Sequence, residues 1–286
     1  MSIRVSGQKL NLFPIMPGPN AQNLTPKTWN LPLVRCWAAN LAPPAILHAL
    51  LTQHVLVAVA VTAAFAAGAW LLRGATAGGA LAGFAVALAV FVTAGPGGFA
   101  ALVSVFSVAW LTTRLGYRRK QLLGLAESAR GRSAAQVLAN LGAAAGFSVA
   151  AHVTGYPALL TAAMAALAEA AADTVASECG ETLRERAYLI TTMRAVPAGA
   201  NGGVSVPGTV AGVAAAAMVG TVATATHVVP WSALPIVIGA GVVATVIDSV
   251  LGATLEERGL IGNNGVNFAS TIAAGVIALL LVKLGS

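Results

Sequence analysis

Charge is what this sequence has least of. Its 286 residues include 16 Lys and Arg and 9 Asp and Glu, so only 9% of the chain is charged. Ordinary soluble domains carry roughly a quarter charged residues. The hydrophobic share is 57% and the mean hydropathy is +0.82. A soluble globule needs more charge to cover its surface, and a disordered chain would not carry so much apolar surface. The composition indicates a polytopic membrane protein.

Several familiar motifs are also missing. The two cysteines, Cys36 and Cys179, stand in different contexts and do not predict a disulfide. The four histidines form no HExxH pattern, and neither CxxC nor GxSxG occurs, so zinc and serine-hydrolase chemistry find no support. No GxxxxGK[ST] P-loop is present. The net charge of +7 fits a positive-inside bias and attraction to anionic lipid headgroups, so we expect membrane lipids and no nucleic acid as partners.

Long uncharged stretches locate the spans. Arg73 is the only charge between Cys36 and Thr113, and the stretches 133–168, 195–247 and 259–282 carry none. A spanning helix needs about 20 mostly apolar residues. Alternating barrel segments are absent, so the spans are helices. The prediction is an all-α bundle of eight transmembrane helices at 45–72, 75–94, 99–115, 134–153, 157–176, 206–229, 232–251 and 266–284.

Seven spans is the alternative, because His48, Gln53 and His54 dilute the first one. We expect residues 45–286 to form one transmembrane domain behind a flexible or interfacial tail, 1–44. The loop 114–132 holds six Lys and Arg against one acid, which predicts a cytoplasmic location. Counting spans from it places the charges of 178–194 and 256–258 on the same side.

Polar residues at membrane depth are costly and are therefore candidates for function. On the fourth predicted span, Arg132, Gln136 and Asn140 are spaced i, i+4, i+8 and share one helix face. A cation with two amides on one stripe suits a phosphate or a nucleotide. The alternative is a snorkelling arginine with two interhelical amide bonds.

Carboxylates gather at the ends of two other spans. Glu169, Asp173 and Ser177 share one face of the fifth, with Glu178 adjacent, and Asp248 is alone near the end of the seventh. This pattern suits Mg²⁺, which takes one or two carboxylates plus waters and substrate phosphates. Asp248 would complete the metal site or act as a base. The alternative for the fifth span is a structural ion pair with Arg184, Arg186 or Arg194.

The segment 189–209 is uncharged after Arg194, yet its prolines and glycines forbid a regular helix. Irregular backbone at membrane depth survives where it lines a polar cavity or is buried in protein. We therefore expect a broken, Gly-rich segment at the cytoplasmic side, whose Asn201-Gly202-Gly203 amides could bind an anion. The eighth span begins with asparagines. Asn263 and Asn267 are spaced i, i+4, and Asn264 and Asn267 are spaced i, i+3; simple N-capping is the alternative.

At these residues the sequence resembles the integral membrane family of phytyl-phosphate kinase, which includes bacterial homologues and animal transmembrane protein nineteen. The resemblance covers about residues 75–286. The chain departs from the family pattern at Val175, where Trp is usual, and at Ala200, where Thr is usual. The matching blocks are 113–120, 136–140, 173–180, 189–192, 197–205, 248–253 and 264–267.

The resemblance implies an enzyme that phosphorylates a prenyl or phytyl monophosphate to its diphosphate, with CTP as the expected nucleoside triphosphate donor. It implies that Asp173, Glu178 and Asp248 are catalytic and hold Mg²⁺. The residues expected to bind substrate or nucleotide are Arg114, Arg119, Lys120, Arg132, Gln136, Asn140, Thr191, Thr192, Arg194, Asn201, Gly202, Gly203, Ser205, Asn264 and Asn267.

Two other functions stay open at this point. One is a transporter of an anionic metabolite or lipid phosphate, which should show polar groups near the midplane and a repeated half-chain. The other is a different CTP-dependent membrane enzyme, a polyprenol kinase or a cytidylyltransferase. We expect an integral protein of a bacterial inner (plasma) membrane with its active site facing the cytoplasm. The residues do not distinguish CTP from ATP or UTP, and they set neither the prenyl chain length nor the oligomeric state.

Overall fold

The computed structural model describes residues 2–5, 8–11, 44–122, 124, 130–183 and 186–285. The chain divides into two compact units, Met1–Gln53 and His54–Ser286. In the first unit, β1 (Ser2–Val5) pairs antiparallel with β2 (Gln8–Asn11). Most of the predicted tail 1–44, including Cys36, lies outside the described residues.

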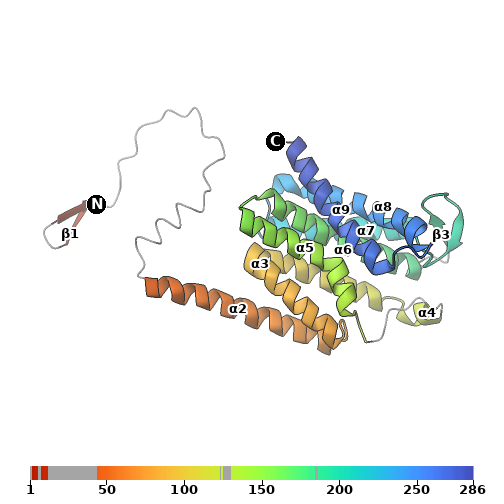
Figure 1. The fold of residues 1–286 in the computed structure, drawn as a ribbon, viewed down its shortest axis with the longest axis horizontal. Helices are drawn as coiled ribbons and strands as arrows, with labels where there is room; N and C mark the ends of the chain where they lie inside the picture. Colours follow the sequence, from red (N-terminus) through yellow and green to blue (C-terminus); the bar gives the residue numbers. More distant parts are fainter. Residues whose placement is uncertain are drawn as a thin grey trace. The chain divides into compact units, whose positions relative to one another are not determined.

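Long helices make up the second unit (Figure 1). Seven helices in the described part of the chain are long and apolar enough to cross a membrane, which confirms the predicted all-α polytopic bundle. Between α6 and α7 lies a small antiparallel sheet of β3 (Arg186–Leu189), β4 (Ala195–Pro197) and β5 (Gly203–Val204), in the order β4-β3-β5. The helices are α2 (Pro44–Leu71), α3 (Ala77–Arg114), α4 (Tyr117–Leu122), α5 (Ala134–Thr154), α6 (Ala158–Leu183), α7 (Val206–Ala225), α8 (Leu234–Leu251) and α9 (Asn263–Leu284).

The helix α3 is a hairpin of two helical limbs. A straight helix from Ala77 to Trp110 would be about 50 Å long. Trp110 Nε1 nevertheless donates a hydrogen bond to the Leu72 carbonyl, at 3.2 Å, just before α3 begins. The reversal occurs at Gly95, whose φ of 74° and ψ of −174° are not helical, next to Pro96. The limbs 77–94 and 96–114 correspond to the second and third predicted spans, so the seven described helices contain eight straight segments.

Gly95 is where the hairpin is most sensitive to substitution. Its backbone conformation is accessible almost only to glycine, and a Cβ there would meet nothing within 4 Å. We expect Gly95→Ala to destabilise the fold by about 1–3 kcal/mol through backbone strain alone. The measurement is thermal unfolding in detergent. Gly146→Ala, at an equally open position inside α5, is the control and should be neutral or stabilising; an equal loss in both would contradict this account.

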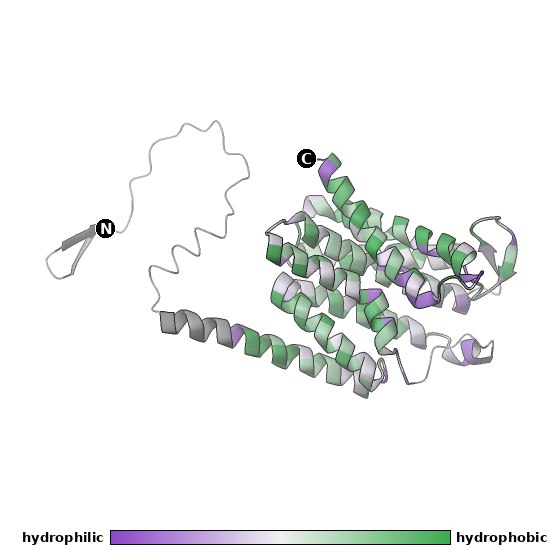
Figure 2. Ribbon diagram, in the orientation of Figure 1, coloured by the Kyte–Doolittle hydropathy of each residue, from purple (hydrophilic) through white to green (hydrophobic). Residues whose placement is uncertain are grey.

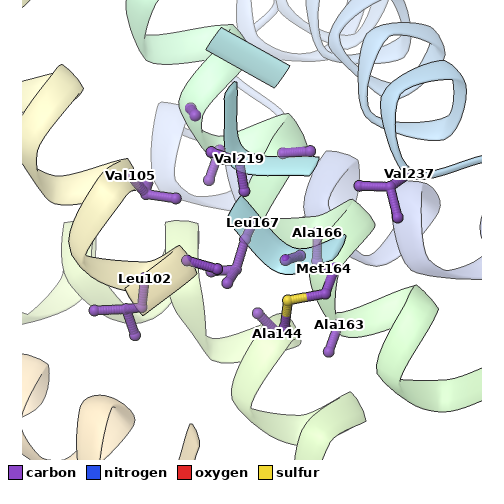
Figure 3. Close-up of a cluster of buried hydrophobic side chains, with 14 of the residues drawn as sticks. Leu102, Val105, Ala144, Ala163, Met164, Ala166, Leu167, Val219 and Val237 are labelled. Atoms are coloured by element: carbon purple, nitrogen blue, oxygen red, sulfur yellow. The ribbon is translucent and has the colours of Figure 1, made fainter. Parts of the chain in front are cut away.

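The central helix is α6, which packs against α3, α5, α7, α8 and α9. Its alanines let neighbouring helices approach closely, as small residues do in membrane bundles. Gly212 on α7 shows how tight the approach is, because a Cβ there would lie 2.8 Å from the Ala172 carbonyl oxygen. Figure 3 shows the larger side chains that fill the remaining space, among them Met164 and Leu167 of α6, Leu102 of α3 and Val219 of α7.

Hydrophilic residues gather at one end of the bundle. Figure 2 shows them around α4 and β3, whereas the lengths of the helices are hydrophobic. The turn of the α3 hairpin lies at the opposite end, since a Cβ on Gly97 would come within 2.8 Å of Thr226 Oγ1 in the turn after α7. The fold therefore concentrates most of the charged groups of the described bundle at one end, with Lys283 near the end of α9 as an exception.

Candidate functional site

A polar cavity of about 460 Å³ opens at this hydrophilic end. Its walls come from α5, α6, α7, α8 and α9 and from the turn that joins β4 to β5. Segments that lie more than 30 residues apart in the sequence, such as 132–140, 172–181 and 242–256, thus contribute polar groups to the same cavity. The predicted site residues that line it are Arg132, Gln136, Asn140, Asp173, Glu178, Asn201, Gly202, Gly203, Ser205, Asp248 and Asn267.

Two aspartates form the acidic side of the polar cavity. Asp173 of α6 and Asp248 of α8 have their carboxyl groups within hydrogen-bonding range of each other. Asp248 also accepts a hydrogen bond from the Ser270 hydroxyl of α9, at 3.0 Å. Glu256 adds a further negative charge that acts on both aspartates. Two facing carboxylates repel each other unless a proton or a cation lies between them.

This pair fits Mg²⁺ of the sparsely coordinated kind. Within the described part of the chain, no group of three or more His, Cys, Asp or Glu side chains is arranged to hold a metal ion. Mg²⁺ does not need such a cage, because it keeps several waters and binds through one or two carboxylates plus phosphates. Asp173 and Asp248 supply that minimum, beside a cavity large enough for phosphates.

Glu169 lies one helical turn before Asp173, within the core of the bundle. It is 1% exposed, and its Oε1 has no hydrogen-bond partner. Asp173 and Asp248 both act on it electrostatically. Glu169 shares the face of Asp173 as predicted, but it does not line the polar cavity.

Arg132 is the cation of the polar cavity, and its backbone is held in place by the segment before α3. Its amide donates to the Gly74 carbonyl at 3.1 Å, and its own carbonyl accepts from the Thr76 amide at 3.0 Å. The side chain donates to the Thr174 hydroxyl at 3.4 Å and acts electrostatically on Asp173. The guanidinium thus stands beside the acidic pair without forming a salt bridge within 4.0 Å in the described structure.

The two amides of the α5 stripe have partly structural roles. Gln136 completes a capping box, since its Oε1 accepts from the Ser133 amide at 2.8 Å. Asn140 Oδ1 accepts a hydrogen bond from the side-chain amide of Asn267 of α9, at 3.2 Å. This is one of the interhelical amide bonds expected under the alternative interpretation of a snorkelling arginine with two such bonds. Both side chains still border the polar cavity.

The turn Ala198–Asn201 and β5 form another part of the cavity wall and bring backbone amides to it. Gly202 has a φ of +71°, and a Cβ there would lie 2.5 Å from the Ser249 carbonyl oxygen of α8. Only glycine permits this contact. The Gly203 amide is used within the turn, where it donates to the Ala200 carbonyl at 2.9 Å. Ser205 caps α7 by accepting from the Gly208 amide at 3.2 Å.

Lys120 and Glu178 form a buried ion pair. Lys120 also donates to the Thr113 carbonyl at 3.0 Å, and Glu178 Oε1 accepts from the Thr113 hydroxyl at 2.8 Å. Lys120 does not line the polar cavity, and both carboxylate oxygens of Glu178 have protein partners. The pair joins α4 to α6, so an ion pair does form on α6, with Lys120 in place of the predicted arginines.

Several predicted residues are not brought to the polar cavity. Arg114 lies over the Trp110 ring, 4.3 Å from its centroid, and donates to the Leu72 carbonyl. The turn between β3 and β4 exposes three of them, Thr191, Thr192 and Arg194. The tip of this hairpin projects from its sheet, so these residues lie away from the polar cavity. Asn264 is exposed on α9. The side chain of Arg119 lies outside the described residues.

Two lining residues were missing from the predicted set although their spacing pointed to them. Asn263 precedes Asn267 by one helical turn, and both border the cavity. N-capping does not explain these asparagines, because Gly262 is the N-cap and no side chain caps α9. Glu256 follows Asp248 by eight residues and reaches the cavity at the end of the π-helical turn Gly252–Glu256. Such turns often occur at functional sites.

Comparisons with known proteins place this architecture in a family. The model of the integral membrane protein DUF92 family matches residues 60–275. An uncharacterized membrane protein of Methanocaldococcus jannaschii is 31% identical over 183 residues, covering 63% of this chain and 74% of the relative. One of Synechocystis sp. is 31% identical over 204 residues, with 69% and 79% covered.

A plant relative extends this similarity. The protein VTE6, chloroplastic, of Arabidopsis thaliana is 24% identical over 222 residues, covering 74% of this chain and 66% of the relative. No solved structure matches the chain. The match to more than half of the chain, together with the 31% identical relatives, shows that the protein belongs to the integral membrane protein DUF92 family.

Proposed function

We propose that the protein is a kinase of isoprenoid monophosphates, prenyl or phytyl, with CTP as the expected donor and a prenyl diphosphate as the product. The observation that carries this proposal is the meeting of the Asp173–Asp248 pair with Arg132 at one polar cavity. A divalent cation and phosphates need this combination of charges. The resemblance to the phytyl-phosphate kinase family supports the substrate class.

In the proposed reaction, an oxygen of the acceptor monophosphate attacks the γ-phosphorus of the nucleoside triphosphate. The new P–O bond forms the prenyl diphosphate, while the bond from the γ-phosphorus to the β–γ bridging oxygen breaks and the nucleoside diphosphate leaves. The acceptor oxygen is already ionised, so no histidine is required as a base. Mg²⁺ held by Asp173 and Asp248 would neutralise the charge that develops on the phosphoryl group.

The chain's own residues would position the two phosphates. Arg132 would bind phosphate oxygens through its guanidinium, which is suited to such contacts. The Asn201 and Gly202 backbone and the side chains of Asn263 and Asn267 would orient the donor. We propose that Glu178, with both oxygens bonded within the protein, anchors α4 to α6 and does not bind metal.

We also propose that the polar cavity faces the cytoplasm of a bacterial cell, since the basic loop 114–132 belongs to the same end of the bundle. A nucleoside triphosphate would reach it there. A transporter would place its polar groups near the midplane, whereas this cavity lies at one end. This location favours the enzyme.

The test uses purified protein in detergent with Mg²⁺, γ-labelled CTP, ATP or UTP, and matched prenyl alcohols and monophosphates. We expect label in a prenyl diphosphate, and no transfer when EDTA replaces Mg²⁺. Label in a monophosphate formed from the alcohol would instead identify a polyprenol kinase. Release of the label as pyrophosphate, together with an unlabelled CDP-linked lipid, would identify a cytidylyltransferase. Absence of transfer to every monophosphate would overturn the proposal.

A further inference from the structure

A second, largely apolar cavity lies beside the polar one. It measures about 410 Å³ and is bordered by α2, the segment 73–75, both limbs of α3, α5, and one residue each of α4 and α6. Its walls include Phe65, Ala69, Leu102, Phe106 and Leu141, with polar residues near its mouth. We call this space the apolar groove. Its volume is within the range of cavities that bind small organic ligands.

The apolar groove and the polar cavity share two lining residues, Arg132 and Asn140. Arg132 is the more informative, because its backbone is fixed by hydrogen bonds to Gly74 and Thr76 at the entrance of the groove. A phosphate bound by this guanidinium would therefore face the acidic pair on one side and a hydrocarbon-lined space on the other. A molecule with a phosphate head and an apolar tail matches both spaces at once.

The apolar groove extends into the length of the bundle. Gly83 lies six residues after Ala77, where the first limb of α3 begins, which corresponds to about 9 Å along the helix. Leu102 lies twelve residues before Arg114, or about 18 Å from the end of the second limb. Because the two limbs are antiparallel, both residues lie deeper than Arg132. A tail that starts at Arg132 would thus pass Gly83.

Gly83 has the geometry of a residue that keeps this passage open. It lines the apolar groove, and a Cβ built on it would meet nothing within 4 Å. A Cβ at this position would therefore not strike a neighbouring helix. The small residue is therefore not required by helix packing.

We propose that the apolar groove holds the hydrocarbon tail of the acceptor lipid phosphate, and that Gly83 determines how long a tail it accepts. This inference rests on the proposed function and adds the location of the tail and a specificity-determining residue. The occupant is a lipid monophosphate, since the wall is mostly apolar and includes the cations Arg73, Arg114 and Arg132, of which Arg132 also borders the polar cavity.

The test compares Gly83→Phe with Gly146→Phe. Gly146 lies on α5, also has open space around a Cβ, and lines neither cavity, so it is a matched control. Both variants are assayed with dimethylallyl, geranyl, farnesyl and geranylgeranyl monophosphates. We expect Gly83→Phe to lower kcat/KM for the longest acceptor by about tenfold or more, the scale of steric discrimination by apolar pockets, and to leave the shortest nearly unchanged. Retained activity on the shortest acceptor also shows that the variant is folded.

Equal losses for all four acceptors, or no change for any, would overturn the proposal. A second measurement does not need turnover: geranylgeranyl monophosphate with a photoreactive tail should label α3 or α5 inside the apolar groove of the wild type, and Gly83→Phe should remove the label. Labelling confined to lipid-facing surfaces would also overturn it. If no prenyl phosphate is turned over, the proposed kinase function fails. The labelling still shows whether the apolar groove holds the hydrocarbon tail.

Discussion

Asparagine in place of either Asp173 or Asp248 is expected to abolish phosphoryl transfer while leaving the protein folded. Asparagine keeps the shape of the side chain and can still accept the hydrogen bond from Ser270 at position 248. It removes one of the two negative charges proposed to hold Mg²⁺. We expect a loss of about 4 kcal/mol of transition-state stabilisation, because a bound metal ion supplies several kcal/mol. This loss corresponds to a kcat that is about 10³-fold lower.

The control for this prediction is Glu257→Gln. Glu257 is exposed, follows Glu256 directly and does not line the polar cavity. Its substitution therefore removes an acidic residue next to the site without changing the site itself. Steady-state kinetics should be paired with a direct measurement of Mn²⁺ binding, which both aspartate variants should weaken. Activity within tenfold of wild type in Asp248→Asn, with unchanged Mn²⁺ affinity, would exclude Asp248 from the proposed metal site.

The second large effect concerns stability and comes from the buried pair Lys120–Glu178. Their side chains are 1% and 9% exposed. Lys120→Met would leave the Glu178 carboxylate buried without its counter-charge, which typically costs about 3–5 kcal/mol. We expect a clearly lower melting temperature in detergent, whereas Glu257→Gln should leave the melting temperature unchanged.

The double variant Lys120→Met/Glu178→Gln separates a structural role from a catalytic one. Its glutamine can still accept from the Thr113 hydroxyl and can donate to the Thr112 and Thr113 carbonyls that Lys120 contacts in the wild type. Removing both charges should therefore recover most of the stability, as replacement of whole buried pairs often does. We expect kinase activity to return with it. A stable double variant with no activity and weaker Mn²⁺ binding would instead make Glu178 a metal ligand.

Much of the fold could be predicted because charge is so scarce here. The uncharged stretches are long, so the positions of the spans followed from hydropathy, and the limbs 77–94 and 96–114 closely match two predicted spans. The stripe Arg132–Gln136–Asn140 was visible for the same reason, since helical spacing places three isolated polar residues on one face. All three line the polar cavity.

Other features depended on contacts between residues far apart in the chain. Lys120 and Glu178 are separated by 58 residues, and no local pattern distinguishes a lysine that pairs with a glutamate from one that binds phosphate. Thr191, Thr192 and Arg194 looked equivalent to Asn201 in a polar segment. Strand pairing between β3 and β4 places them at an exposed turn and leaves Asn201 at the cavity.

The sequence by itself determined that this is a helical membrane protein and that most of its charged groups stand at span ends, because a charge in the hydrocarbon layer is too costly to occur without a reason. Only the tertiary structure decided which of those groups meet. The reversal at Gly95 brings two limbs of one helix together around the apolar groove, and the small residues of α6 let its neighbours approach until Asp173 and Asp248 face each other. Close packing of alanine and glycine leaves no hydropathy pattern of its own, so these contacts could not be read from the chain.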